Sequence, residues 1–136
     1  MKKSLNTFKN ISETDVWNSE NIYHLKTDIS RIAKTLYQYE IYQMISDVPG
    51  DFVELGVFKG VSLIRFLTFR SILENNFSRK FYGFDTFKKF PRNKNTYDKK
   101  FVKKFEKIAG YGISKEELEK ILKKKNFKIL ISLKAI

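Results

Sequence analysis

The sequence predicts an α/β fold in which helices pack on a parallel sheet. Three observations support this prediction. A short apolar segment, Phe52–Leu55, is followed by glycines and a helix-like stretch. A second apolar segment ends at Asp85, and apolar residues recur at helical spacing on both sides of the two segments. A strand, a helix and a second strand in this order form a right-handed crossover unit, so the two strands are expected to be parallel.

The amino-terminal segment gives no comparable signal. Residues 1–26 show no clear hydrophobic period and are interpreted as a mobile leader, which leaves 27–136 as the folded domain. His24, the only histidine, lies in this polar segment. We therefore expect it to be solvated rather than catalytic.

A long helix is expected over residues 29–48. Apolar residues recur there every three or four positions, and Pro49 with Gly50 ends the pattern. This apolar stripe is expected to pack in the core. It consists of Ile29, Ile32, Leu36, Tyr37, Ile41, Met44, Ile45 and Val48.

Phe52–Leu55 is expected to be the first strand, and its apolar character is typical of a strand covered on both faces. A helix over 62–73 follows, and its apolar residues extend around more than one face, so we expect it to be largely buried. A turn at 75–78 precedes the second strand, expected over 80–84.

Two more helices and a third strand complete the pattern. A helix is expected from about Asp98 until Gly110 stops it. The next helix has the clearest start, because Ser114 and Glu117 have the spacing of a capping box. Alternating residues over 127–133 predict the third strand.

Composition narrows the classes of partner. The net charge is +12 and the pI is about 9.8, which would suit a nucleic acid or another anionic surface. However, lysine far outnumbers arginine, the better phosphate ligand, so a nucleic-acid partner is not favoured. The absence of cysteine excludes disulfides and is compatible with a cytoplasmic location. The apolar runs are far shorter than the ~20 residues of a membrane span, and the start of the chain does not resemble a secretion signal.

The segment after the first strand predicts a ligand site. Glu54, Gly56 and Gly60 follow a Glu-x-Gly-x-x-x-Gly pattern, and glycines at the carboxyl end of a parallel strand let the backbone approach a ligand. The pattern is looser than the Gly-x-Gly-x-x-Gly of dinucleotide sites. It suits a ligand without a pyrophosphate, and S-adenosylmethionine is the obvious candidate.

Three polar side chains have candidate roles in that site. Glu54 can receive the ammonium of a bound amino acid; alternatively, it is a strand-end acid that accepts from nearby amides. The Ser62 hydroxyl, with the amides that open the next helix, suits a ligand carboxylate, or it caps the helix, and both can hold. Asp85 ends the second strand. Counted from Gly60, it lies near the position, ~20 residues on, where nucleotide folds place a ribose-binding acid. The alternative for Asp85 is a strand-end acid without a ligand.

These residues fall in two segments that resemble the macrocin O-methyltransferase family of class I S-adenosylmethionine-dependent enzymes. The segments are 49–60 (PGDFVELGVFKG) and 83–91 (GFDTFKKFP). The resemblance extends to 39–41 upstream and 113–118 downstream, and covers roughly 28–133. The family includes sugar O-methyltransferases of antibiotic biosynthesis.

The resemblance implies more than the residues alone. It implies that Glu54, Gly56, Gly60 and Ser62 line the methionine end of S-adenosylmethionine and that Asp85 binds its ribose. It implies the amino-terminal half of a doubly wound sheet, with strands in the order 3-2-1. The implied activity is O-methylation of a sugar or similar small hydroxyl acceptor.

Two departures from the family shape these expectations. Lys88 and Lys89 stand where the family usually has Glu-Gly. Family members also continue into a region that binds magnesium and positions the acceptor, and no such ligands follow here. We therefore expect a truncated chain that is inactive alone, with no assignable catalytic residue. The alternatives are a non-catalytic cofactor-binding remnant and, less favoured, a basic nucleic-acid module. An unpaired edge at Phe52–Leu55 would favour self-association.

Overall fold

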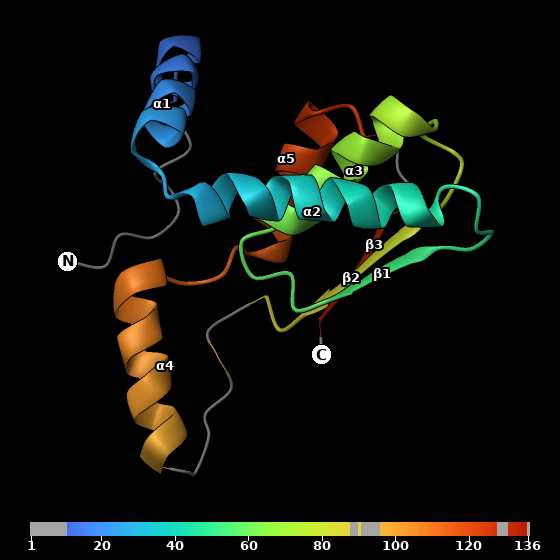
Figure 1. The fold of residues 1–136 in the computed structure, drawn as a ribbon. Coiled ribbons are helices and arrows are strands. Elements are labelled where there is room, and N and C mark those ends of the chain that lie inside the picture. Colours follow the sequence, from blue (N-terminus) through green and yellow to red (C-terminus); the bar gives the residue numbers. More distant parts are fainter. Residues whose placement is uncertain (1–10, 88–89, 91–95, 128–130, 136) are drawn as a thin grey trace.

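The computed structural model describes residues 11–87, 90, 96–127 and 131–135, with only the backbone described for Thr96 and for 131–135. Helices and a parallel sheet confirm the α/β class (Figure 1). Three adjacent parallel strands lie in the order β1-β2-β3. The elements are α1 (Glu13–Lys26), α2 (Ile29–Ile45), β1 (Phe52–Leu55), α3 (Val61–Leu73), β2 (Phe81–Asp85), α4 (Thr96–Ala109), α5 (Lys115–Lys124) and β3 (Ile131–Ala135).

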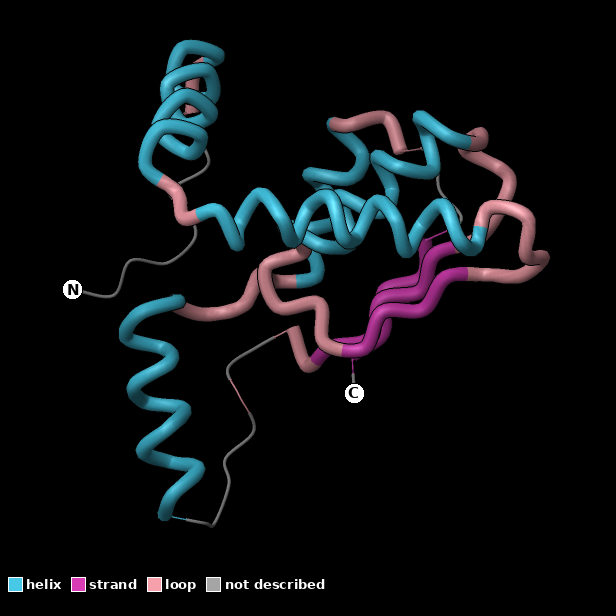
Figure 2. The backbone as a smooth tube through the Cα atoms, in the orientation of Figure 1, coloured by secondary structure: helices cyan, strands magenta, loops and turns pink. Residues whose placement is uncertain are grey.

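The helices α2, α3 and α5 lie on one side of the sheet, and no described helix lies on the other side (Figures 1 and 2). Because helices cover only one face of the sheet, side chains along β1 alternate between less and more exposed positions. Phe52 packs between Phe66 of α3 and Phe81 of β2, with ring centroids 4.7 Å from each. Val53 and Leu55, in contrast, are 54% and 77% exposed. The expectation that β1 is covered on both faces is therefore wrong for the described residues.

The core lies between the sheet and α3. Leu63, Phe66 and Leu67 of α3 are buried against it, as expected for a largely buried helix. Ile72 is an exception, since it is exposed. Leu118 and Leu122 of α5 belong to the same core.

Only part of the predicted stripe of α2 packs against the core: Ile45 does so, whereas most of the other members are exposed. The buried residue of α2 is Tyr42, which the stripe omits. The Tyr42 ring packs near Phe66 and Phe69, and its hydroxyl donates to Glu74 (2.5 Å). A tyrosine ring can be buried while its hydroxyl keeps a hydrogen-bond partner, so the side of α2 that packs in the core need not be its most hydrophobic side. The stripe members that are exposed are Ile29, Leu36, Tyr37, Met44 and Val48.

Part of the expected leader is helical. Residues 13–26 form α1, whose start is fixed by a capping box in which Ser12 accepts from the Asp15 N–H and Asp15 accepts from the Ser12 N–H. No residue of α1 is buried, and Figure 1 shows the helix standing away from the sheet. A helix without a buried face has no hydrophobic period to detect. Residues 1–10 lie outside the described part of the chain.

The remaining local predictions agree closely with the structure. In the turn before β2, the Phe77 N–H donates to Asn75 Oδ1 (2.8 Å). Gly110 ends α4 with a φ of +71°, and Ser114 accepts from the Glu117 N–H (3.2 Å) at the start of α5. The third strand is β3, and residues 128–130 of its predicted range lie outside the described residues.

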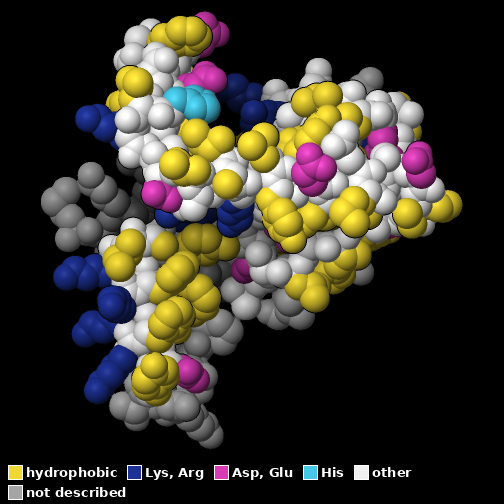
Figure 3. Space-filling view, in the orientation of Figure 1, with side chains coloured by type: hydrophobic (Ala, Val, Ile, Leu, Met, Phe, Trp, Pro, Cys, Tyr) yellow, Lys and Arg dark blue, Asp and Glu magenta, His cyan; other side chains and the backbone are white. Residues whose placement is uncertain are grey.

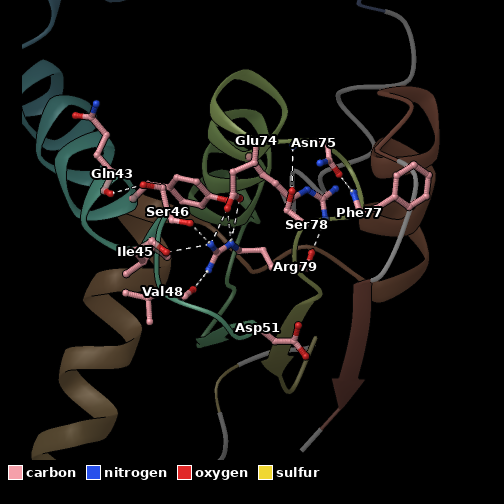
Figure 4. A network of polar contacts seen from close by, with 12 residues as sticks. Gln43, Ile45, Ser46, Val48, Asp51, Glu74, Asn75, Phe77, Ser78 and Arg79 are labelled. Carbon is pink, nitrogen blue, oxygen red and sulfur yellow. Dashed lines mark hydrogen bonds and ion pairs between the residues drawn. The ribbon is translucent and has the colours of Figure 1, made fainter.

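A buried ion pair fastens α2 to the amino-terminal edge of the sheet (Figure 4). Arg79, in the segment that leads into β2, pairs with Glu74 (2.6 Å). The same guanidinium donates to the backbone carbonyls of Ile45 and Ser46 where α2 ends. The hydrogen bond from Arg79 is the main cause that lowers the pKa of Glu74. No pattern in the sequence indicates this network, because it joins three separate segments.

Candidate functional site

The residues predicted to form a ligand site lie together at the carboxyl-terminal edge of the sheet. Pairing of β1 with β2 places Leu55 beside Phe84, and the Gly56 N–H donates to the Phe84 carbonyl (2.8 Å). The loop 56–60 then leads into α3, while Asp85 ends β2 beside this loop. Parallel strands thus bring both polar motifs to one edge.

Glu54 has one engaged carboxylate oxygen and one unengaged oxygen. The Ser62 hydroxyl donates to Oε1. Oε2 is buried and has no hydrogen-bond partner among the described residues. Burial is the main cause that raises the pKa of Glu54, and the negative charge of Asp85 raises it further, against the hydrogen bond from Ser62 and the charge of Lys34. A buried acceptor without a donor is costly, so a cationic donor at Oε2 would be stabilised here.

The amino terminus of α3 is open to an anion. Its N-cap is Gly60, and no side chain caps the helix. Ser62 therefore does not act as the cap that the sequence allowed; its hydroxyl bonds Glu54 instead. First-turn amides and the helix dipole favour a negatively charged group at this position.

The two motif glycines differ in their surroundings. Gly56 has a φ of +87°, and a Cβ built there would meet nothing within 4 Å. Gly60 has a φ of +75°, and its Cβ would lie 2.7 Å from Leu118 Cδ1 of α5. The space at Gly56 is open, as close backbone approach requires, whereas glycine at Gly60 permits α5 to pack against the loop.

Asp85 is engaged with the backbone of both loops. Its Oδ2 accepts from the Phe58 N–H (2.8 Å), and its Oδ1 accepts from the Phe87 N–H (2.9 Å). The Thr86 hydroxyl also donates to Oδ1 (3.3 Å). These bonds are those of a strand-end acid, and they leave part of the acceptor capacity of the carboxylate unused.

Several phenylalanines that were not predicted as site residues also border the site. The Phe58 ring lies 5.6 Å from Phe105 of α4 and 6.4 Å from Phe90, measured between centroids. The Phe58 carbonyl also accepts from the Ile113 N–H (2.7 Å). Figure 3 shows apolar side chains along α4 with lysines at its outer edge, and Phe101 is exposed there. The available signal in the sequence was a phenylalanine two residues after Gly56 and another two residues after Asp85.

The described residues offer no magnesium site. No group of three or more His, Cys, Asp or Glu side chains within them could hold a metal ion. His24 lies on α1, where its ring contacts Tyr23 edge to face rather than the sheet edge. Lys88 and Lys89 lie outside the described residues. No helix in the described ranges is long and apolar enough to cross a membrane.

Comparison with known families identifies the chain. Residues 40–130 match the family described as Macrocin-O-methyltransferase (TylF). The chain belongs to this family. The matched range contains both motifs of the sheet edge, and it confirms the resemblance detected in the sequence. Membership of a methyltransferase family implies S-adenosylmethionine as the methyl donor.

Two solved structures are similar to this macrocin-O-methyltransferase family chain. One is described as the apo structure of CalS11, TDP-rhamnose 3′-O-methyltransferase, an enzyme in calicheamicin biosynthesis, at 21% identity and a TM-score of 0.41. The match covers 79% of this chain and 55% of that one. The other is CalS11, calicheamicin methyltransferase, at 19% identity and a TM-score of 0.44, covering 98% and 72%. No curated protein matches the chain.

The residues at this edge of the sheet are compatible with a cofactor that carries an amino-acid group. The buried, unpartnered Oε2 of Glu54 is complementary to an ammonium, and the uncapped start of α3 is complementary to a carboxylate. These two groups are combined in the methionine portion of S-adenosylmethionine. Gly56 leaves open space beside them.

Proposed function

We propose that the chain binds S-adenosylmethionine at the carboxyl-terminal edge of β1 and β2 and belongs to the donor half of a doubly wound methyltransferase domain. The observation that carries this proposal is the buried Glu54 Oε2 without a partner, next to an α3 amino terminus that no side chain caps. Family membership supports the identity of the donor.

Each residue has a defined part in this proposal. Glu54 receives the ammonium, and the first-turn amides of α3 receive the carboxylate of the methionine portion. Gly56 and Gly60 shape the loop, and Ser62 orients Glu54 through its hydrogen bond. Asp85 uses its remaining acceptor capacity for a ribose hydroxyl. The bound cofactor supplies an electrophilic methyl group, and the chain holds it in position.

Binding should change the protonation of Glu54. Burial raises the pKa of this carboxyl in the free protein. An ammonium at Oε2 favours the ionised form, so cofactor binding should release a proton at pH values where the free carboxyl is partly protonated. Measured proton release would therefore distinguish an ionic contact between Glu54 and the cofactor ammonium from a position merely close to it.

The acceptor is proposed from the family and from CalS11, which is named as a TDP-rhamnose methyltransferase. We propose a sugar hydroxyl or a similar small hydroxyl group. In this assignment Glu54 and Asp85 bind the donor and are not available to remove the acceptor proton. We therefore propose that the chain alone binds the donor without efficient transfer, as a cofactor-binding unit.

The proposal is tested by calorimetric titration of the full chain with S-adenosylhomocysteine. Wild type should bind, whereas Glu54→Gln should bind at least tenfold more weakly and Gly56→Val should lose binding because its side chain fills the open approach. Gly50→Val is the matched control. Gly50 also has positive φ and open surroundings, but it lies at the amino end of β1. Absence of binding by wild type, or equal affinities in all three variants, would overturn the assignment.

A further inference from the structure

Two phenylalanines at the sheet edge have backbone conformations that bulky residues rarely adopt. Phe58, in the loop after β1, and Phe87, directly after β2, both have a φ of +51°. Left-handed backbone is disfavoured for a bulky L residue and persists only where the surroundings impose it. Both residues bond the same group, because their N–H groups donate to the two oxygens of Asp85.

We infer that Asp85 is a positioning residue that clamps both ligand-side loops in their left-handed conformations. One carboxylate oxygen holds the loop after β1, and the other holds the segment after β2. The clamp fixes the Phe58 ring against Phe105 and the Phe87 side chain in the core. This role differs from ribose binding, and it operates in the free protein whether or not the proposed function is correct.

The chemistry of the two bonds favours aspartate over its isosteric amide. Bonds from backbone N–H groups to an ionised carboxylate are stronger than neutral ones. The two backbone partners of Asp85 are both donors, so both side-chain atoms must accept. The side chain of asparagine has only one acceptor, and its NH2 group would oppose the second amide. Asp85→Asn should therefore release one loop while it preserves side-chain volume.

The first test follows the amide protons of Phe58 and Phe87 by NMR in the ligand-free full chain. In wild type, both amide protons should exchange slowly with solvent, because the Asp85 carboxylate accepts both hydrogen bonds. In Asp85→Asn, hydrogen exchange at one of these amides should accelerate by about tenfold or more, as loss of a charge-assisted bond implies. Rapid exchange of either amide in wild type, or unchanged exchange of both amides in Asp85→Asn, would overturn the inference. The wild-type measurement can overturn it even if the variant does not fold.

The second test measures backbone conformation through a pair of variants. Phe58→Gly and Phe58→Ala both remove the ring, but only glycine tolerates positive φ without cost. With Asp85 present, the unfolding equilibrium constant of the alanine variant should exceed that of the glycine variant about fivefold, after the gain of alanine through the unfolded state is subtracted. With Asp85→Asn in the background, the difference should shrink or reverse.

An unchanged difference in the two backgrounds would mean that other contacts impose the conformation, and it would overturn the inference. The bond from the Ile113 N–H to the Phe58 carbonyl is the alternative restraint. Neither test uses a ligand. Failure of S-adenosylhomocysteine to bind would therefore count against the proposed function and leave the clamp standing.

Discussion

Gly60→Ala should destabilise the protein through a collision with α5. The added Cβ would lie 2.7 Å from Leu118 Cδ1, a distance at which atoms must move apart. Leu118 is fully buried, so its side chain cannot turn aside without displacing core neighbours. Overpacking of this kind costs about 1–3 kcal/mol. The φ of +75° adds about 1–2 kcal/mol for any L side chain, partly offset by a gain of about 0.4–1 kcal/mol through the unfolded state.

We therefore expect Gly60→Ala to lower the free energy of unfolding by about 2–4 kcal/mol. Leu118→Ala alone should cost about 2–5 kcal/mol, as for other buried leucines. The double variant should lose about 1–3 kcal/mol less than the sum, because removing the leucine side chain removes the collision. Only the backbone strain at residue 60 should remain.

Gly56→Ala is the matched control. Gly56 has a φ of +87°, but a Cβ there would meet nothing within 4 Å. It should cost about 1 kcal/mol and add to Leu118→Ala without coupling. Urea unfolding followed by circular dichroism measures all five variants. If Gly60→Ala were no worse than Gly56→Ala, or if it were additive with Leu118→Ala, the assigned packing role of Gly60 would be refuted.

Three further predictions concern charge and the open edge. Glu74→Gln should destabilise the chain by about 3 kcal/mol, because the buried Arg79 loses its ionic partner. Wild type should lose stability as pH falls below 4.5 through the lowered pKa of Glu74, and thermal melts of the variant should show a smaller loss. Glu54 should have the opposite effect: because its pKa is raised, the stability of wild type should decrease as pH rises through that pKa. Denaturant titrations of Glu54→Gln should lack this decrease, and an unchanged dependence on pH would contradict the burial assigned to this carboxyl. The double variant Val53→Lys/Leu55→Lys should self-associate less than wild type in light scattering, because charge on the exposed β1 edge opposes the addition of another strand. A wild-type chain that is monomeric at micromolar concentration would contradict this expectation.

Local signals predicted the secondary structure that surrounds the site. The bounds of β1 were predicted correctly, because an apolar segment between two glycine-containing turns can form little else. The start of α5 at Ser114 was predicted because capping is a contact between near neighbours in sequence. The placement of Glu54 and Asp85 at one edge followed from strand polarity.

Contacts between distant segments were beyond prediction. The contact of Gly60 with Leu118 depends on how α5 returns to the loop, so the sequence suggested a ligand-facing role for both motif glycines. The core face of α2 was predicted only in part: Ile45 packs against the core, but Tyr42 was missed because its contacts with Phe66 and Phe69 lie on a distant segment. The two amides held by Asp85 likewise follow from backbone geometry that composition does not encode.

The Arg79 network (Figure 4) lies at the amino-terminal edge of the sheet. The candidate donor site lies at the carboxyl-terminal edge. The Arg79 network and the proposed ligand site therefore lie at opposite ends of the same strands. Substitutions around Arg79 and Glu74 can alter folding while the loops after β1 and β2 keep their geometry. Conversely, those loops can change sequence without loosening α2. Such a chain can acquire new ligand preferences in one region while its attachment points remain constant in another.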